Sequence, residues 1–302
     1  MKLSEVTKGM EGTLLRDGSF DQLSYLTETG VDRFLAFFEN EKFAAQLSNP
    51  KATCILTTPA QAEKIPGGIE GVFLCERPKE AWALIHNALA DNEDYVGKSF
   101  DTVIGKNCSI SPLAVIPEKN VVIGDNVTIE PFVVFRERVT IGNDVLVGAG
   151  TVLGVIPFNY AKDADGQPFR MKSAGKLIIG DHVEMLEYVT VGIGIFPWES
   201  TVIGEGSKMD AFSNLGHGAH MGKNCEITYR AICAGNTRIG DNVFMGIGAI
   251  TRPRVRVGDN ARISIGSVVT TDVPAGETYT GNFAIPHQRY MKNLKESIRE
   301  DD

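Results

Sequence analysis

The sequence predicts a small α/β domain, then a long parallel β-helix, then a short C-terminal α-helix. Three observations lead to this fold class. About the first hundred residues alternate apolar runs with helix-like segments and contain no repeat. A six-residue period follows over most of the remaining chain, and apolar residues at helical spacing come after it. We expect the three parts at residues 1–98, 99–284 and 285–302.

The N-terminal part has the alternation of a small α/β domain. Its strands are expected at the apolar runs RFLAFF, ATCILTT and GVFLC. Its helical segments are expected at ENEKFAAQL, PAQAEKI and KEAWALIHNALAD.

The β-helix is predicted by hexads that follow one another without a gap. One aliphatic or small residue leads each hexad, at Ile203, Met209, Leu215, Met221, Ile227, Cys233, Ile239, Met245, Thr251, Val257, Ile263 and Val269. Shorter runs of the same kind occupy residues 104–116, 123–153 and 179–191. Each hexad suits a short strand and a tight corner, and three hexads close a coil of about 18 residues. Such prisms commonly assemble as trimers, because their flat faces need covering.

Two segments break the period, and a helix follows it. Residues 154–176 are rich in Gly, Asp and Pro, and the sequence GIGIFPWES forms a second excursion with its core at 194–200. Loops that leave a rigid scaffold often carry binding sites. Beyond the repeat, Tyr290, Leu294 and Ile298 fall at helical spacing and predict a short amphipathic helix.

The net charge of the chain and one basic stretch indicate which kinds of molecule it can bind. The 302 residues are 43% hydrophobic and carry a formal net charge of -8, so a core is available and nucleic acid is not the expected partner. One basic stretch, RPRVRVGDNAR, places Arg252, Arg254, Arg256 and Arg262 close together in sequence. It either receives a phosphate or an acidic protein, or forms a solvated edge.

The N-terminal residues and the cysteines bear on location. The sequence MKLSEVTKGMEG lacks the apolar core of a secretion signal, and no window approaches the roughly 18 apolar residues of a membrane span. The five cysteines form no C-x-x-C pair. We therefore expect a cytoplasmic protein with buried free thiols, without disulfides and without a zinc site.

Four sequence stretches carry a resemblance to a known family. They are FFENEKF at residues 37–43, PFNYAKDADGQPF, KLIIGDHVE, and DAFSNLGH at residues 210–217. Together with the order of domains, these stretches resemble the UDP-3-O-acylglucosamine N-acyltransferase family of lipid A assembly, over nearly the whole chain. The resemblance implies a left-handed β-helix, a homotrimer and a nucleotide-binding N-terminal domain. It also implies acyl transfer from a phosphopantetheine thioester to the amine of a nucleotide-linked sugar, with no tightly bound cofactor.

The resemblance assigns substrate-binding residues in two stretches. Phe37 and Phe43 stand where the family's aromatic side chains enclose a uracil base, with Asn40 between them. Phe158 and Tyr160 stand in the stretch similar to a Gly-Phe-Gly-Tyr loop. Stacking on a pyrimidine needs only the face of a ring, so phenylalanine at position 43 satisfies this role without a phenol hydroxyl.

Catalytic roles are expected around His217. Attack by an amine on a thioester needs a base to take a proton, and a histidine has a suitable pKa without large tuning. By position His217 matches the family's base, while His220 faces another way. Asp210 matches the carboxylate that orients the base, by contact across a trimer interface rather than within one subunit. Gly235 lies one coil beyond His217, so its N–H either stabilises an oxyanion or the glycine only serves the corner.

Departures from the family leave the substrate open. Arg254 stands where the family has a second histidine, and GIGIFPWES replaces an Asp-Arg-Gly stretch. We therefore favour transfer to a nucleotide-linked amino sugar over the lipid A substrate itself. The four arginines suit an acyl carrier protein or coenzyme A equally. The alternatives are a coenzyme A-dependent N-acetyl- or N-acyltransferase of a UDP- or dTDP-amino sugar for surface polysaccharide, a metal-dependent hydratase, and a noncatalytic scaffold.

Overall fold

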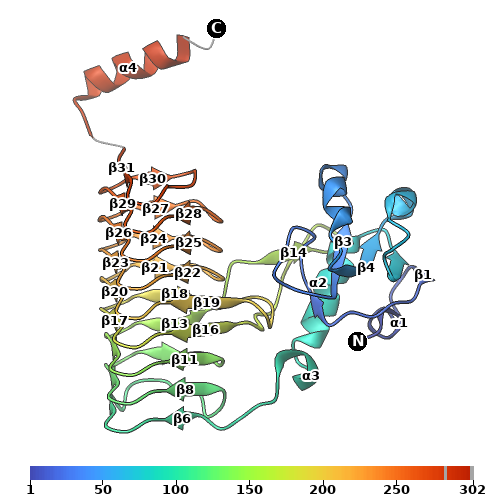
Figure 1. Cartoon of the computed structure of the whole chain (residues 1–302), viewed down its shortest axis with the longest axis horizontal. Helices are drawn as coiled ribbons and strands as arrows, with labels where there is room; N and C mark the ends of the chain where they lie inside the picture. The colour runs from blue at the N-terminus through green and yellow to red at the C-terminus, as the bar shows by residue number, and fades with distance from the viewer. Residues whose placement is uncertain (282–283, 300–302) are drawn as a thin grey trace.

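The computed structural model describes residues 1–281 and 284–299. Figure 1 shows a tall stack of coils, a smaller α/β domain at its side and a helix beyond the last coil. The α/β domain runs through α3, which ends at Val96, and the first strand of the coil, β6, begins at Val103. The expected boundary at residues 98 and 99 falls between these two elements.

The stack is a parallel β-helix, as the hexad period predicts. The leading residues of all twelve hexads are buried, from Ile203 to Val269. Strands three hexads apart pair in parallel, so that Asn214 lies beside Ile232 and Leu215 beside Cys233. One apolar residue per hexad therefore builds a continuous core that runs the length of the stack.

The β-helix has three sheets, one on each side of the prism. The first contains β10 (Val134–Phe135), β13 (Val152–Val155), β18 (Thr190–Gly192), β21 (Asn214–Leu215), β24 (Ile232–Cys233), β27 (Ile250–Thr251) and β30 (Val268–Val269). The second contains β28 (Arg256–Val257), β25 (Arg238–Ile239), β22 (His220–Met221), β19 (Ser200–Ile203), β16 (Lys176–Ile179), β11 (Val139–Ile141), β8 (Val121–Ile123) and β6 (Val103–Ile104). The third contains β31 (Thr278–Tyr279), β29 (Arg262–Ile263), β26 (Phe244–Met245), β23 (Glu226–Ile227), β20 (Lys208–Met209), β17 (Glu184–Met185), β12 (Leu146–Val147), β9 (Thr128–Ile129) and β7 (Ser109–Ile110).

The corners between strands use the left-handed backbone region. Asn236, Asn242 and Asn260 have φ values of 60°, 56° and 59°, and Gly218 has a φ of 63°. Asparagine and glycine adopt this region at lower cost than other residues. The Asn and Gly residues of the hexads therefore let the chain turn sharply without breaking the stack.

The N-terminal domain has a five-stranded sheet that contains the three expected strands and two that the sequence analysis did not expect, β1 and β2. Its strand order is β1-β5-β4-β3-β2, and only the β1–β5 pair is antiparallel. The elements are α1 (Leu3–Val6), β1 (Thr13–Arg16), β2 (Gln22–Leu23), β3 (Phe34–Phe38), the 3-10 helix η1 (Glu41–Ser48), β4 (Ala52–Thr57), the 3-10 helix η2 (Pro59–Lys64), β5 (Gly71–Leu74), α2 (Pro78–Leu89) and α3 (Glu93–Val96). Helix α2 covers the sheet through Trp82, whose indole N–H donates to Leu35 O at 3.0 Å.

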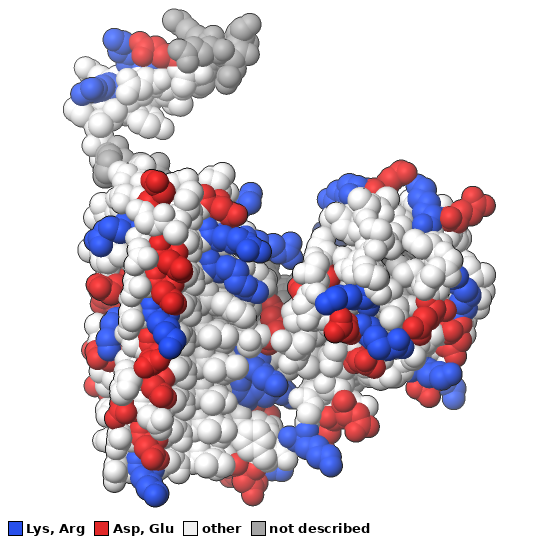
Figure 2. Space-filling model, viewed as in Figure 1, with Lys and Arg blue, Asp and Glu red and all other residues white. Residues whose placement is uncertain are grey.

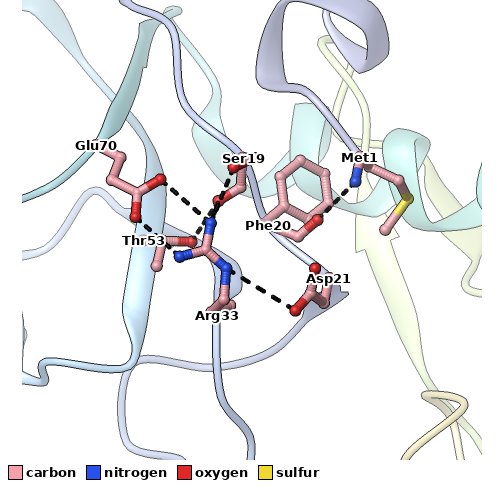
Figure 3. Close-up of polar contacts among 7 residues, drawn as sticks. All are labelled: Met1, Ser19, Phe20, Asp21, Arg33, Thr53 and Glu70. Atoms are coloured by element: carbon pink, nitrogen blue, oxygen red, sulfur yellow. Dashed lines mark hydrogen bonds and ion pairs between the residues drawn. The ribbon is translucent and has the colours of Figure 1, made fainter.

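A polar network fixes the start of this domain. Figure 3 shows the Arg33 guanidinium between Glu70, Ser19 and Asp21. Arg33 Nη1 lies 2.9 Å from Glu70 Oε1, and Nη2 donates to the Ser19 carbonyl at 3.1 Å. The N-terminal ammonium of Met1 donates to Phe20 O at 2.9 Å. These contacts hold the segment before β2 against the sheet.

Both excursions from the β-helix reach the N-terminal domain. The first forms a hairpin of β14 (Tyr160–Lys162) and β15 (Pro168–Arg170), which lies against α2. The second inserts the buried Phe196 between Tyr25, Trp82 and His86, with ring centroids 5.0 to 5.7 Å apart. The segment GIGIFPWES is therefore an apolar plug, which packs into the core of the N-terminal domain and joins this domain to the β-helix.

The cysteines are all free, and four of the five are buried. Burial raises the pKa of the Cys233 thiol to about 12 and that of Cys54 to about 11, so both stay protonated at neutral pH. Cys108 differs from the expectation, because it is partly exposed near the open end of the stack.

Helix α4 (His287–Arg299) stands beyond the last coil in Figure 1, and its Tyr290 and Leu294 are exposed. The side chain of Ile298, expected on the same stripe, lies outside the described residues. None of the helices in the described part of the chain is long and apolar enough to cross a membrane.

Candidate active site

A hollow of about 870 Å³ lies between the N-terminal domain and the β-helix. The domain contributes Tyr25, Thr27 and Glu28, and the coils contribute His217 and Gly235. Figure 2 shows Lys and Arg side chains gathered on the flank of the β-helix that faces the domain. The hollow therefore combines a titratable group, a basic wall and aromatic rings.

His217 lies in this hollow and not inside the coil. It follows β21, at a corner, and its side chain is 27% exposed. Its Nδ1 lies 3.4 Å from Glu199 Oε1, without hydrogen-bond geometry, and has no hydrogen-bond partner elsewhere in the described ranges. Its Nε2 faces Gly235, where an added Cβ would sit only 2.8 Å away. One nitrogen thus faces a buried carboxylate and the other a glycine backbone.

Gly235 lies beside the imidazole because one coil separates the two residues. No described acceptor receives a hydrogen bond from its N–H, while its carbonyl accepts from Arg254 N at 3.1 Å. A side chain at position 235 would meet the His217 ring. The coil arithmetic thus predicts correctly that Gly235 is the neighbour of His217.

Three of the four predicted arginines line the hollow. Arg252, Arg254 and Arg256 lie on its wall, joined by Arg238, which the sequence analysis did not single out. Arg238 pairs in register with Arg256 on neighbouring strands, and burial lowers its pKa. Among the described residues, none of these guanidinium groups forms a salt bridge with a carboxylate. The wall therefore suits a ligand with several negative charges.

Arg262 does not join this wall. It lies on β29, in the third sheet, with its guanidinium carbon 4.5 Å from the centroid of the Phe244 ring. Arg262 lies one hexad after Arg256, and one hexad carries the chain to the next sheet of the prism. The two arginines therefore lie on different faces.

Asp210 does not contact His217 within the chain. It follows β20 in the third sheet and lines a different hollow with Glu184 and Lys208. Its Oδ1 accepts from Ala211 N at 2.7 Å. The carboxylate at His217 is Glu199, which comes from the second excursion rather than from the repeat. The role expected for Asp210, a contact across a trimer interface, involves a second copy of the chain and stays a prediction.

The other histidines near the site are structural. His220 Nε2 lies 3.0 Å from Ser200 O on the neighbouring strand, and burial, assisted by Arg238, lowers its pKa. His86 is fully buried, with Nε2 2.9 Å from Lys172 O, and burial lowers its pKa as well. No group of three or more His, Cys, Asp or Glu side chains that could hold a metal ion is found in the parts of the chain that the structure describes.

Phe158 and Tyr160 line a different hollow from His217 in the same chain. Their rings are 4.9 Å apart, and Phe158 is 96% exposed. They share this second hollow with Arg136 and Arg170, whereas Asn159 between them lines the His217 hollow. Phe158 thus projects into solvent, Tyr160 is half-buried, and neither ring lines the His217 hollow of its own chain.

The residues that the resemblance assigns to the uracil base lie in the N-terminal domain, and none of them lines the His217 hollow. Phe37, at the end of β3, packs against Tyr25 and Trp82. Phe43 is exposed on η1, and Asn40 caps η1 by accepting from Lys42 N at 3.1 Å. Three aromatic residues that the sequence analysis did not select do line the hollow: Tyr25, Phe196 and Trp198.

Comparisons with known proteins identify the repeat. A family model described as bacterial transferase hexapeptide (six repeats) matches residues 120–154, and one described as hexapeptide repeat of succinyl-transferase matches residues 236–271. The chain is a hexapeptide-repeat protein. This hexapeptide-repeat chain also resembles proteins named UDP-3-O-acylglucosamine N-acyltransferase.

Two of these relatives show the extent of the likeness. The hexapeptide-repeat chain is 43% identical to the protein of Sinorhizobium fredii over 156 residues, which are 52% of this chain and only 44% of that protein. It is 27% identical to the protein of Helicobacter hepaticus over 254 residues, which are 78% of this chain and 76% of that protein. The first match thus spans less than half of the relative.

A solved structure shares the fold. The hexapeptide-repeat chain superposes on a UDP-N-acetylglucosamine acyltransferase from Bacteroides fragilis with a TM-score of 0.52 and 28% sequence identity. The match covers 58% of this chain and 65% of that one. The expected fold class, a left-handed parallel β-helix after an α/β domain, is confirmed.

Proposed function

We propose that the protein is an N-acyltransferase, which moves an acyl group from a phosphopantetheine thioester to the amine of a nucleotide-linked amino sugar. The observation that carries this proposal is the arrangement at His217. A partly exposed imidazole has one nitrogen near a buried carboxylate and the other open to a hollow of substrate size. A histidine placed in this way can act as the general base for an attacking amine.

Gly235 supplies the second chemical requirement. The tetrahedral intermediate of acyl transfer carries an oxyanion, which needs a donor already in place. The Gly235 N–H has no acceptor among the described residues, and a Cβ built on Gly235 would lie 2.8 Å from His217 Nε2, so this glycine borders the imidazole. We propose that its N–H is the donor to the oxyanion that forms beside the base.

The arginine wall suits the phosphates of the donor arm or of the nucleotide. Arg238, Arg252, Arg254 and Arg256 line the same hollow as His217. Acyl carrier protein is an acidic donor, and coenzyme A carries phosphates of its own. A coenzyme A-dependent N-acetyltransferase of UDP- or dTDP-amino sugars is therefore the second candidate, because the same wall serves both donors.

We also propose that three copies of the chain assemble along the prism. The exposed Tyr188 and Phe212 rings lie on successive coils and stack 5.1 Å apart, and Phe132 is exposed at the same corner two coils before Tyr188. Solvent-exposed aromatic side chains of this kind indicate an interaction surface.

A substrate panel tests the function directly. Purified protein is mixed with UDP- and dTDP-linked amino sugars and with acyl groups on acyl carrier protein or coenzyme A, and products are identified by mass spectrometry. We expect an amide on the sugar nitrogen with one of the two donors. Absence of any acylated sugar, or formation of an ester alone, would contradict the proposal.

Arg256→Gln is expected to raise KM for the thioester donor about tenfold while leaving kcat near that of the wild type, because one charge-assisted contact to a phosphate is lost. Arg262→Gln is the matched control. Both arginines occupy the first position of a two-residue strand, but Arg262 lies over Phe244 and outside the hollow. Equal donor KM values for the two variants would remove Arg256 from the binding wall.

A further inference from the structure

Glu199 closes the second excursion and is clamped there by backbone hydrogen bonds. Its N–H donates to Phe196 O at 2.9 Å, and its carbonyl accepts from Lys176 N at 3.0 Å. On the other side of the loop, Ala174 N donates to Ile195 O at 2.8 Å. The backbone of residue 199 therefore has a fixed place beside the start of β16.

The carboxylate of Glu199 is fixed as well. Oε2 accepts from Ile195 N at 2.6 Å, and the side chain is only 8% exposed. A Cβ built on Gly218 would lie 2.1 Å from Oε1, so a glycine at that position leaves the space that the carboxylate fills. Oε1, the oxygen that does not bind Ile195 N, is thus directed at His217 Nδ1, 3.4 Å away.

This contact determines which imidazole nitrogen is free. A carboxylate beside Nδ1 favours the tautomer with the proton on Nδ1, and leaves the lone pair on Nε2. Nε2 is the nitrogen that faces Gly235 and the hollow. The charge of Glu199 also acts on Tyr25, His86, His220 and Arg238, which lie in the same region.

We propose that Glu199, from the non-repeating segment at residues 194–200, is the residue that positions His217 for proton transfer, and that docking of the N-terminal domain through Phe196 keeps it in place. The proposal rests on the proposed function, in which His217 is the base. Phe196 lies three residues before Glu199 and packs among Tyr25, Trp82 and His86. The segment that replaces the family's Asp-Arg-Gly therefore has a chemical consequence at the imidazole.

Glu199→Gln tests the inference, with Glu205→Gln as the control. Glu205 is a carboxylate on the β-helix surface, 3.0 Å from Lys223 and outside the hollow. We expect Glu199→Gln to lower kcat by roughly 10²-fold or more with KM little changed, since orientation and charge at the base are lost. Glu205→Gln should match the wild type in both measurements.

A spectroscopic readout separates this role from a structural one. In protein with ¹⁵N-labelled histidine, the His217 signals are those absent from the His217→Ala spectrum. Glu199→Gln should change their tautomer-dependent shifts. Glu199→Asp, which keeps the charge but is one methylene shorter, should recover part of the rate. Unchanged shifts and rate in Glu199→Gln overturn the inference.

Asp210→Asn tests the alternative, in which Asp210 rather than Glu199 orients the imidazole. If it lowers kcat while Glu199→Gln does not, the orienting carboxylate belongs to a neighbouring copy and the inference is overturned. A wild-type rate in His217→Ala would instead refute the proposed base, whatever the Glu199 variants do. The two failures are therefore distinguishable.

Discussion

His217→Ala is expected to lower kcat by roughly 10² to 10⁴-fold, the usual contribution of a general base. The imidazole lies in the hollow with one nitrogen toward Glu199 and the other toward Gly235, so alanine removes the group that we propose takes the proton. KM should change little, because the arginine wall and the aromatic rings stay. Steady-state kinetics with the best substrate pair of the panel give both constants.

His182→Ala is the matched control for this substitution. His182 is another β-helix histidine at a corner, 3.7 Å from Asp144, and it lies outside the hollow. We expect its rate to equal that of the wild type. If His217→Ala and His182→Ala are both fully active, another group takes the proton and the mechanism fails while the fold is unaffected.

The repeat is the part of the structure that the sequence predicts best. Because each hexad adds one strand and one corner, position in the period determines whether a side chain is buried, as the buried residues from Ile203 to Val269 confirm. The same arithmetic places Gly235 beside His217, one coil away. It also explains why Arg262 is separated from Arg256, since six positions lead to the next sheet.

The carboxylate at His217 could not be predicted in this way. Glu199 belongs to a segment without a period, and its place depends on long-range packing of Phe196 into the N-terminal domain. Two signals did exist in the sequence, the apolar composition of GIGIFPWES and the single acid at its end. The orientation of Phe158, which is almost fully exposed, likewise follows from how the hairpin lies on α2, and not from its local sequence.

Phe196→Ala is expected to lower the free energy of unfolding of the N-terminal domain by about 3 to 5 kcal/mol, the usual cost of removing a buried phenylalanine. Its ring is 1% exposed and contacts the rings of Tyr25, Trp82, His86 and Trp198. Denaturant unfolding followed by tryptophan fluorescence measures the change, because Trp82 and Trp198 both lie in this cluster.

Leu84→Ala is the control for Phe196→Ala, since Leu84 is an exposed residue of α2 and its removal should change stability by less than about 0.5 kcal/mol. Phe196→Leu separates packing from catalysis. It keeps most of the buried volume and should stay folded, yet a looser plug allows Glu199 to shift, so kcat should fall more than the loss of stability explains. Equal unfolding midpoints for Phe196→Ala and wild type would show that the domain does not depend on this plug. A folded Phe196→Leu with wild-type kcat would show that its packing does not reach the imidazole.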